Sequence, residues 1–577
     1  MFLHTDRWHS ATVRWALVAA WAIVLSGCDR KPAAGDGDNG NSAGSQGSAR
    51  HSAASAGVLL KDVTTDVGID FVHERGARGD YRLPELIGAG GAMLDFDNDG
   101  DLDIYLIQGG DAEADNDAYR NRLYRNDAGR FVDVSAASHA DVPGYGMGCA
   151  VADYDNDGDL DIYVTRLGAN VLLRNNGAGA FEDVAAAAGV DDDGFGVSAA
   201  FFDYDRDGLL DLYVVNYVTW SRAIEHTCYS PDGLRDYCSP GEYPSAADKL
   251  YRNLGGNRFE DVSASSGVAS IARDGLGVVW TDVDNDGWCD IYVANDQMPA
   301  FCWINDGEGR FVEDAALRGC AVNENGVAIA GMGVAVQDID GNGFEDILIS
   351  NIAMQSHLFL TNANGFFEDR TRQYGLATWN IQETGFGVAW VDLDNDGTPE
   401  LFVANGAVGR NPAAPDLQRP YAQLNQLARK DDSGRYRLVD ASAIPALQSN
   451  EVSRGVIQGD YDNDGDIDLL ITNNGARPQL LRNESASGSH WISLSLHDES
   501  LHRDALGARV EVVTSDRTFR RTLRPQSGYL GSNDPRMHIG VGKASRIDRV
   551  IVTWPDGTKR QFSAPATDQH HTLRKNG

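Results

Sequence analysis

The sequence predicts an all-β fold, in which a seven-bladed β-propeller is followed by a small C-terminal β domain. Three observations support this fold class. A nine-residue acidic motif occurs seven times, and such regular recurrence is typical of repeat architectures. Each copy lies between short apolar segments, about four to a repeat, which is the strand content of one propeller blade. From about residue 490 the motif is absent and apolar residues alternate with polar ones, as in Trp491-Ile492-Ser493-Leu494-Ser495-Leu496.

The acidic motif has carboxylates at positions 1, 3, 5 and 9 and a glycine at position 6. Its first copy reads Asp95-Phe96-Asp97-Asn98-Asp99-Gly100-Asp101-Leu102-Asp103. Alternate acidic residues in a tight loop point their oxygens at one centre, and the glycine permits the positive φ that the turn requires. Ca²⁺ takes roughly 6–8 oxygen ligands. The motif therefore predicts a calcium site in each loop, with a solvated acidic turn as the alternative.

The predicted calcium ligands share positions 1, 3, 5 and 9 of the seven loops. They are Asp95, Asp97, Asp99 and Asp103; Asp153, Asp155, Asp157 and Asp161; Asp203, Asp205, Asp207 and Asp211; Asp282, Asp284, Asp286 and Asp290; Asp338, Asp340, Asn342 and Asp346; Asp392, Asp394, Asp396 and Glu400; and Asp460, Asp462, Asp464 and Asp468. Asn342 and Glu400 depart from the pattern but keep an oxygen ligand. Position 12 is always apolar, which excludes an EF-hand, since that loop needs Glu there.

The strands around each loop follow one order. A glycine usually stands five residues before the first Asp, a short apolar strand enters the loop, and a second leaves it. A third resembles Leu123-Tyr124-Arg125-Asn126, and a fourth resembles Phe131-Val132-Asp133-Val134. The last repeat lacks a fourth strand, whereas Leu60-Lys61-Asp62-Val63 precedes the first repeat. We therefore expect this N-terminal segment to complete the last blade and close the ring, which removes its open edges.

Two repeats carry insertions, at residues 217–247 and 406–436. The first is rich in aromatic residues, which either bind a ligand such as a sugar or form a small satellite core. The second contains a helix-like segment from Tyr421 to Lys430.

The N-terminal residues predict export. Residues 1–28 contain an apolar run that is too short to span a bilayer and ends in Leu25-Ser26-Gly27-Cys28, a tetrapeptide similar to the bacterial lipobox. Cys28 is therefore the predicted lipidation site, with a plain secretory signal as the alternative. Residues 29–56 are predicted to be a disordered tether. The predicted propeller spans residues 57–489 and the C-terminal domain residues 490–577.

The charge distribution argues against a nucleic-acid partner. The chain has a formal net charge of −36, and much of it belongs to the acidic loops. Residues 490–577 hold 14 Lys/Arg and 9 Asp/Glu, a local charge of +5. Nucleic-acid binding requires clustered cations that contact phosphates, so this partner is not expected.

Seven cysteines are compatible with disulfides in an exported chain. Cys28 is assigned to the lipid, and local spacing favours a Cys228–Cys238 disulfide. A Cys302–Cys320 disulfide within one repeat is a weaker expectation, and Cys149 and Cys289 are expected to be buried free thiols.

The repeats resemble the FG-GAP/VCBS repeats of integrin α-subunit propellers, and the tail resembles the ASPIC/UnbV domain. The tail motifs are Arg503-Asp504-Ala505-Leu506-Gly507-Ala508-Arg509-Val510, Gly528 to Gly540, and Val552-Thr553-Trp554-Pro555-Asp556-Gly557. Together the chain is similar to a bacterial member of the cartilage acidic protein family. The resemblance implies a seven-bladed propeller with calcium in its loops, and it transfers no catalytic residue.

The function expected from these features is that of an envelope-tethered, calcium-binding module for binding, adhesion or interaction. Its partner would be a glycan or an envelope protein, and a lipid anchor would hold it facing the periplasm or the exterior. His226, His570 and His571 do not form a recognised catalytic motif. The alternative is a calcium-dependent enzyme or accessory protein of polysaccharide or secondary metabolism, with a site in the propeller channel.

Overall fold

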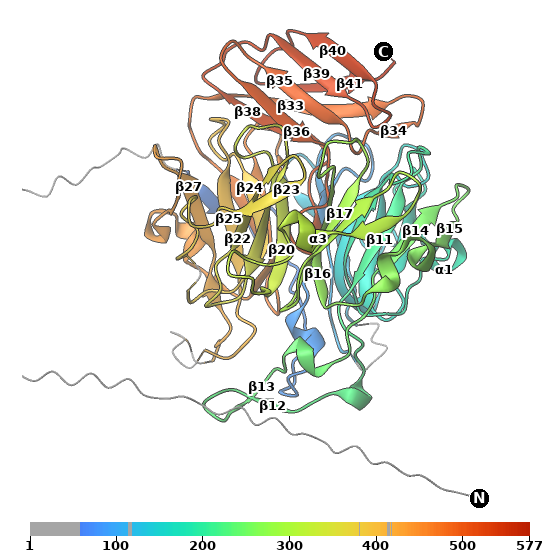
Figure 1. Cartoon of the computed structure of the whole chain (residues 1–577), viewed down its shortest axis with the longest axis vertical. Coiled ribbons are helices and arrows are strands. Elements are labelled where there is room, and N and C mark those ends of the chain that lie inside the picture. The colour runs from blue at the N-terminus through green and yellow to red at the C-terminus, as the bar shows by residue number, and fades with distance from the viewer. Residues whose placement is uncertain (1–57, 113–117, 380, 412–415, 417, 577) are drawn as a thin grey trace, which may run out of the picture. The chain divides into compact units, whose positions relative to one another are not determined.

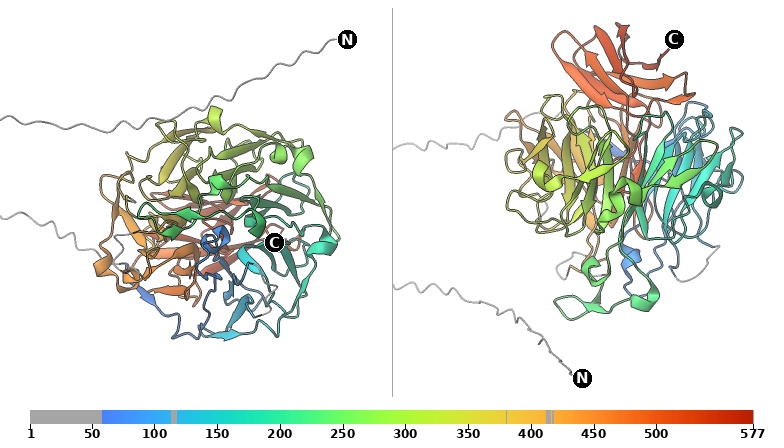
Figure 2. Two further views of the ribbon diagram at one scale, coloured as in Figure 1. Left: turned by 90° about the horizontal axis from the view of Figure 1, so that it is seen from below. Right: turned by 45° about the vertical axis from the view of Figure 1, so that its right-hand side comes forward.

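The structure is a computed structural model that describes residues 58–576 except 113–117, 380, 412–415 and 417. The predicted signal peptide, the lipidation site Cys28 and the tether lie outside the described residues. Seven sheets of the described chain form a ring (Figure 2). Within each sheet, the four strands of the repeat pair antiparallel to one another, so the all-β propeller prediction is confirmed. We call these sheets blades 1 to 7.

Blades 1 to 4 follow the predicted strand order. Blade 1 contains β2 (Gly91–Leu94), β3 (Asp103–Leu106), β4 (Arg122–Asn126) and β5 (Phe131–Asp133), and blade 2 contains β6 (Tyr145–Ala152), β7 (Asp161–Leu167), β8 (Val171–Asn175) and β9 (Phe181–Asp183). Blade 3 contains β10 (Gly196–Phe202), β11 (Asp211–Asn216), β14 (Lys249–Asn253) and β15 (Phe259–Asp261), and blade 4 contains β16 (Gly275–Thr281), β17 (Asp290–Asn295), β18 (Phe301–Asn305) and β19 (Phe311–Glu313).

Blades 5 to 7 complete the ring. Blade 5 contains β20 (Gly331–Gln337), β21 (Asp346–Asn351), β22 (Leu358–Ala363) and β23 (Phe366–Asp369), and blade 6 contains β24 (Gly385–Val391), β25 (Glu400–Asn405), β27 (Gln426–Lys430) and β28 (Tyr436–Leu438). Blade 7 contains β30 (Ser453–Gly459), β31 (Asp468–Asn473), β32 (Gln479–Asn483) and β1 (Leu60–Asp62).

The N-terminal strand closes the ring as predicted. β1 pairs antiparallel with β32, and Leu60 lies opposite Asn483. The first strands of successive blades contact one another in chain order, and β30 of blade 7 contacts β2 of blade 1. Apolar side chains that alternate along these strands form the cores between blades, because both faces of each sheet are covered by a neighbour.

The predicted helix at Tyr421 to Lys430 is wrong. This stretch forms β26 (Gln423–Leu424), which pairs with β29 (Asn450–Glu451), and then β27, the third strand of blade 6. Pairing with β25 supplies backbone partners along the sheet and buries Leu427 and Ala428, so tertiary contacts override the helical propensity of the sequence.

Helices in the described chain are short. The α-helices are α1 (Ala185–Ala188), α2 (Ser263–Ser266) and α3 (Ala315–Arg318), and the 3₁₀ turns are η1 (Leu83–Leu86), η2 (Arg222–Ile224), η3 (Pro240–Glu242), η4 (Val268–Ser270), η5 (Ala441–Ala443) and η6 (Pro445–Gln448). None of the helices among these residues is long and apolar enough to cross a membrane.

The C-terminal strands build a separate apolar core above one face of the ring (Figure 1). They are β33 (His490–Asp498), β34 (Arg503–Asp504), β35 (Arg509–Val513), β36 (Thr518–Thr522), β38 (Met537–Gly542), β39 (Arg549–Thr553), β40 (Lys559–Ser563) and β41 (His570–Arg574). Between β36 and β38 the chain leaves this domain and enters the ring, where β37 (Gly531–Ser532) pairs parallel with β2. We call residues 526–534 the channel segment.

The blade 3 insertion extends from the opposite face of the ring, where Figure 1 labels its hairpin of β12 (Cys228–Tyr229) and β13 (Arg235–Asp236). Tyr217, Tyr243 and Cys238 of this insertion are buried in the central apolar cluster. The aromatic residues of the insertion thus mainly build a core, which is the second of the two interpretations above.

Candidate functional site

The seven acidic loops share one backbone design. The carboxylate at position 1 accepts the N–H of position 6 in every loop, at 2.8–3.0 Å. The side chain at position 5 accepts the N–H of position 7, for example Asp99 from Asp101 at 2.9 Å. Positions 4 and 6 both have positive φ, 59° at Asn98 and 94° at Gly100. Position 6 therefore has the left-handed backbone conformation for which glycine was predicted.

Carboxylate oxygens converge inside these loops. In five of them, three carboxylates each offer an oxygen within 4.8 Å of the others, for example Asp153, Asp155 and Asp161, and two further groups of this kind exist in the described chain. Buried Oδ1 atoms without a protein partner occur in six loops: those of Asp97, Asp155, Asp203, Asp282, Asp284, Asp392, Asp394 and Asp462. Orphaned, convergent oxygens of this kind fit a hard cation such as Ca²⁺.

The pKa values of the loop carboxylates also favour a bound cation. Burial raises the pKa of Asp153 to about 7, and repulsion from Asp157 and Asp155 adds to the shift. Burial likewise raises the pKa of Asp103 to about 8 and that of Asp290 to about 8. A carboxylate that is removed from water next to other carboxylates needs a compensating positive charge. The loops are therefore short of positive charge when they hold no cation.

The two loops that depart from the motif have further polar contacts, and the arginine contact of blade 6 recurs in blade 3, where Arg252 pairs with Asp205 and Asp207. In blade 6, Arg429 pairs with Glu400 through Nε at 3.0 Å and also pairs with Asp394. A guanidinium group thus shares the carboxylates that a cation would use. In blade 5, the Asn342 amide donates to the Asn362 carbonyl at 2.8 Å.

The residue at position 4 of the acidic motif joins consecutive loops. This role was not predicted from the sequence. Asn98, Asn156, Asn285, Asn395 and Asn463 each donate from Nδ2 to the position 6 carbonyl of the next loop, at 3.1–3.5 Å. Arg206 makes the equivalent bond to the Gly287 carbonyl. The last link runs from Asn463 of blade 7 to Gly100 of blade 1, so it also closes the ring.

The asparagine that ends the third strand is a second link between blades. Its Nδ2 donates to the position 2 carbonyl of the preceding loop at 2.8–2.9 Å; the pairs are Asn126–Tyr461, Asn175–Phe96, Asn253–Tyr154, Asn305–Tyr204, Asn362–Val283 and Asn483–Leu393. Its own N–H donates to the carboxylate at position 9, for example Asn126 to Asp103 at 2.8 Å. The recurrent Asn of the third-strand motif was the sequence signal for this link.

The basic C-terminal domain contacts the acidic loops. Arg509 Nη1 lies 3.1 Å from Asp282 Oδ2 and 2.8 Å from Asn285 Oδ1. Arg536 Nη2 donates to the Asp460 carbonyl at 2.7 Å, and Arg517 Nη2 donates to the Gly397 carbonyl at 2.8 Å. The opposite charges of the two regions, visible in the sequence, are therefore brought together.

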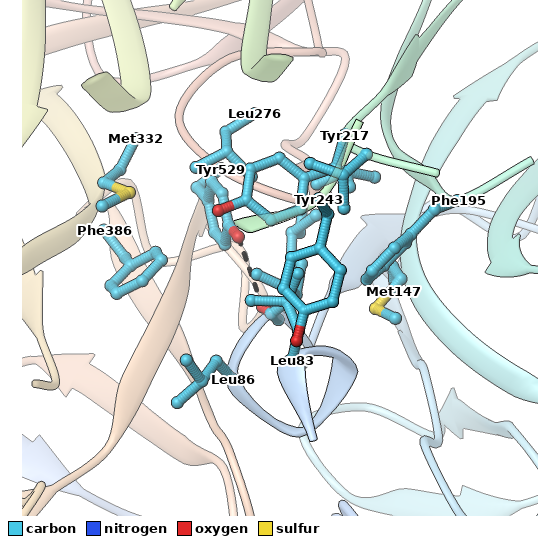
Figure 3. Close-up of a cluster of buried hydrophobic side chains, with 14 of the residues drawn as sticks. Leu83, Leu86, Met147, Phe195, Tyr217, Tyr243, Leu276, Met332, Phe386 and Tyr529 are labelled. Atoms are coloured by element: carbon cyan, nitrogen blue, oxygen red, sulfur yellow. Dashed lines mark hydrogen bonds between the residues drawn. The ribbon is translucent and has the colours of Figure 1, made fainter. Parts of the chain in front are cut away.

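The channel segment fills the centre of the ring. Gly528 and Val334 exchange backbone hydrogen bonds at 2.7 and 2.9 Å. Tyr529 and Leu530 belong to a buried apolar cluster with residues from several blades, and the Tyr529 hydroxyl donates to the Ile87 carbonyl at 3.3 Å (Figure 3). A Cβ at Gly90 would lie 2.3 Å from the Leu530 carbonyl oxygen, which explains why glycine precedes the first strand. The channel, where the alternative interpretation of the sequence placed a site, is filled by residues of the protein itself.

In the described chain, the cysteines that the sequence analysis singled out comprise one disulfide pair and four free thiols. The structure joins Cys228 and Cys238 in a disulfide, with an S–S distance of 2.09 Å. Cys302 and Cys320 are buried free thiols, and Cys320 Sγ donates to the Ala315 carbonyl at 3.6 Å, so the expected second disulfide does not form here. Cys149 is a buried free thiol as expected, and Cys289 is half-buried.

The histidines show no shared site. His226 is exposed and packs edge-on against Tyr243 of the same insertion. His570 lies 3.0 Å from Ser493 Oγ through Nδ1, and His571 Nε2 lies 2.9 Å from the Ala566 carbonyl oxygen.

Comparisons with known proteins agree with this architecture. The ASPIC and UnbV family matches residues 498–577, and the FG-GAP-like repeat family matches residues 95–164, 163–214, 282–349 and 338–403. Cartilage acidic protein 1 of Mus musculus is 27% identical over 322 residues, which cover 55% of this chain and 47% of that protein. The repeats, the C-terminal domain and this relative together support the resemblance to the cartilage acidic protein family. The Homo sapiens protein of the same name is 28% identical over 306 residues, or 52% of this chain and 43% of that protein.

The chain spans about half the length, or slightly less, of these curated relatives. Among solved structures, the BP39L lectin from Burkholderia pseudomallei aligns with a TM-score of 0.42 and 10% identity, covering 70% of this chain and 97% of the lectin.

Proposed function

We propose that this protein is an exported, calcium-binding propeller that acts as a binding or interaction module. The observation that carries the proposal is the recurrence of one loop geometry, in which carboxylate oxygens converge and keep buried atoms without a protein partner. The donor set consists of oxygens, which suits Ca²⁺ rather than metals that prefer sulfur or imidazole. Bound calcium would supply the positive charge that these carboxylates require.

The loops serve to hold blades together in this proposal. Except between blades 5 and 6, consecutive loops are bonded through position 4 and through the third-strand asparagine, so a cation that stiffens one loop also fixes the edges of two blades. The links at Asn98 and Asn175 connect blades 1 and 2 in this way. A rigid ring then presents its outer surfaces and loops to a partner, which we propose to be a glycan or an envelope protein.

An interaction role is favoured over catalysis in the channel. The centre of the ring is occupied by Tyr529, Leu530 and the apolar side chains around them, so the protein itself fills the space that a substrate in the channel would need. We further propose that lipid attached to Cys28 tethers the module to the cell envelope. Replacing Cys28 with Ala should release the protein from the membrane fraction, whereas Cys289→Ala should not.

Thermal unfolding tests the calcium proposal. One site at a hundredfold excess of calcium over Kd adds about 2.7 kcal/mol to the free energy of unfolding. With several sites, EDTA should lower the Tm by well over 5 °C, and added calcium should restore it. Magnesium serves as the control, since it demands a stricter octahedral geometry. An unchanged Tm after chelation would contradict the structural role of calcium.

A further inference from the structure

A cavity of about 680 Å³ lies between the C-terminal domain and the loop face of the ring. Loop residues from blades 3 to 6, such as Asp203, Asp282, Asp338 and Asp392, form one side. The strands of the C-terminal domain form the other. This volume is within the ~300–1,000 Å³ that small-molecule sites typically occupy.

Arginines dominate the wall that the C-terminal domain contributes. Arg509, Arg520, Arg521, Arg524 and Arg536 all line the cavity. Some have carboxylate partners, such as Arg524, which lies 2.7 Å from Glu345 and 4.6 Å from the centre of the Trp280 ring. Arg521 donates to the Arg520 carbonyl at 2.8 Å, and no carboxylate of the described chain lies within ion-pair distance of it. Arginine presents a planar fork of donors that matches carboxylate and phosphate groups.

Several buried donors around the cavity have no acceptor in the described protein. The indole N–H groups of Trp280 and Trp390 and Nε of Arg524 are unpartnered. Trp280 is 2% exposed, and the Arg524 side chain is 4% exposed. Buried donors are nearly always satisfied, so their presence around a cavity indicates that a ligand or water supplies the acceptors.

The charge of the cavity depends on the loops. Its lining contains seven cationic residues, since Arg206 and Lys559 join the five arginines. It contains eight acidic residues, of which five are predicted loop ligands: Asp203, Asp282, Asp286, Asp338 and Asp392. Only Glu345, Glu511 and Asp534 are acidic residues outside the ligand positions. A cation in these loops would neutralise the five carboxylates and leave the cavity strongly positive.

We propose that this cavity binds a small multivalent anion through its arginine wall, and that it does so only when the loops hold calcium. The ligand class is one with two or more carboxylate or phosphate groups and no larger than about an acidic disaccharide. The inference rests on the calcium part of the proposed function and assigns a site to it. Without calcium, the loop carboxylates compete for the same arginines and repel the ligand.

Calorimetric titration of the full chain tests the proposal. The probes are succinate, glucose 1,6-bisphosphate and digalacturonate, with maltose as a neutral compound of similar size. In calcium, at least one anion should bind with a stoichiometry of one, and maltose should not bind. Succinate and digalacturonate test recognition of carboxylates, and glucose 1,6-bisphosphate tests recognition of phosphates. Loss of a charge-assisted contact in Arg521→Gln should weaken binding at least about tenfold.

The test includes a matched control variant outside the cavity and a second variant within it. Arg546 lies in the same domain with its side chain 77% exposed and outside the cavity, so Arg546→Gln should bind as the wild type does. If Arg521→Gln does not fold, Lys559→Gln replaces it, since Lys559 lines the cavity from a partly exposed strand.

Calcium content, measured by atomic emission on the same samples, separates the two proposals. Protein that contains calcium but binds none of the anions overturns the cavity proposal and leaves the calcium proposal intact. Anion binding that persists in EDTA, or that Arg521→Gln and Lys559→Gln both leave unchanged, also overturns it. Protein that takes up no calcium contradicts the calcium proposal and the inference built on it.

Discussion

The contact between blades 5 and 6 differs from the contacts between the other neighbouring blades. Between blades 1 and 2, Asn175 Nδ2 donates to the Phe96 carbonyl at 2.8 Å, and Asn98 Nδ2 lies 2.8 Å from Asp159 Oδ1. Between blades 5 and 6 the equivalent residues are Lys430 and Gly341, which make neither bond in the described chain. Both polar links are missing at this one position in the ring.

Aromatic packing replaces the polar links there. Phe359 contacts Trp390 and Tyr374, with ring centres 5.7 and 4.7 Å apart, and Trp390 packs against Tyr436 at 5.2 Å. Lys430 Nζ lies 5.5 Å from the Tyr374 ring centre. The Gly397 carbonyl, which would accept the missing position 4 bond, accepts from Arg517 instead.

The comparison shows two ways to hold blades together. Polar links tie each loop to the next, so a cation in one loop supports both blades. The apolar contact between blades 5 and 6 does not pass through the loops. The loops with Asn342 and Glu400, the two departures from the motif, are the ones on either side of it. Calcium should therefore contribute least to the contact between these blades.

The largest effect expected from a single substitution is at a third-strand asparagine. Asn175 is 1% exposed, donates to two carbonyls and accepts from Gly177 N–H. Asn175→Ala leaves these buried groups unpaired, each at about 1–3 kcal/mol, and should lower the free energy of unfolding by about 2–4 kcal/mol. Lys430→Ala at the equivalent position should cost less than about 1 kcal/mol. Urea denaturation measures both, and equal losses would contradict the distinction between the two contacts.

An intermediate effect is expected from removing the guanidinium group in the blade 6 loop. Arg429 pairs with Glu400 and Asp394, so it competes with a cation for their oxygens. Arg429→Gln should raise the calcium affinity of that loop about tenfold, because the carboxylates lose their internal counter-charge. Calcium titration followed by calorimetry measures the change. Arg437→Gln, at an exposed pair with Asp431, is the matched control. A fall in affinity in Arg429→Gln would show that the arginine supports the site.

The smallest effect concerns the missing position 4 link. Gly341 has φ +78°, and a Cβ added there meets no atom within 4 Å. Gly341→Asn places the residue used in five other loops at a backbone angle that Asn tolerates. It should raise the free energy of unfolding by about 0.5 kcal/mol. One cause is a new hydrogen bond to the Gly397 carbonyl, and the other is the lower conformational entropy of the unfolded chain once glycine is replaced. Gly341→Ala, which lacks the donor, separates the two causes in the same denaturation experiment.

The sequence predicted the parts of this fold that repeat. The acidic motif and the strands around it gave the blades, and the missing fourth strand of the last repeat led to the pairing of Leu60 with Asn483. Each of these features recurs at fixed spacing, so one copy supports the interpretation of the next. Asn98 and Asn175 also recur, but their role depends on the neighbouring blade, which a single repeat does not reveal.

The sequence did not predict the contacts made by single segments. Gly528 to Ser532 was recognisable as a motif, but its position in the channel depends on how the C-terminal domain docks. The glycines five residues before the first Asp of most loops, such as Gly90 and Gly148, were a signal for close approach of another chain segment. The segment at Tyr421 to Lys430 was misread because its local propensity favours a helix, whereas pairing with β25 decides its conformation.

Native mass spectrometry of the folded chain tests the central claim most directly, because it counts bound calcium. The wild type should carry several calcium ions, with one per loop as the upper limit. Asp155→Asn should carry one fewer, since Asp155 contributes a buried, unpartnered oxygen to the blade 2 loop. Asp191→Asn, at an exposed position outside the motif, should carry as many as the wild type. A wild-type chain without calcium, or an Asp155→Asn variant with an unchanged count, would contradict the account.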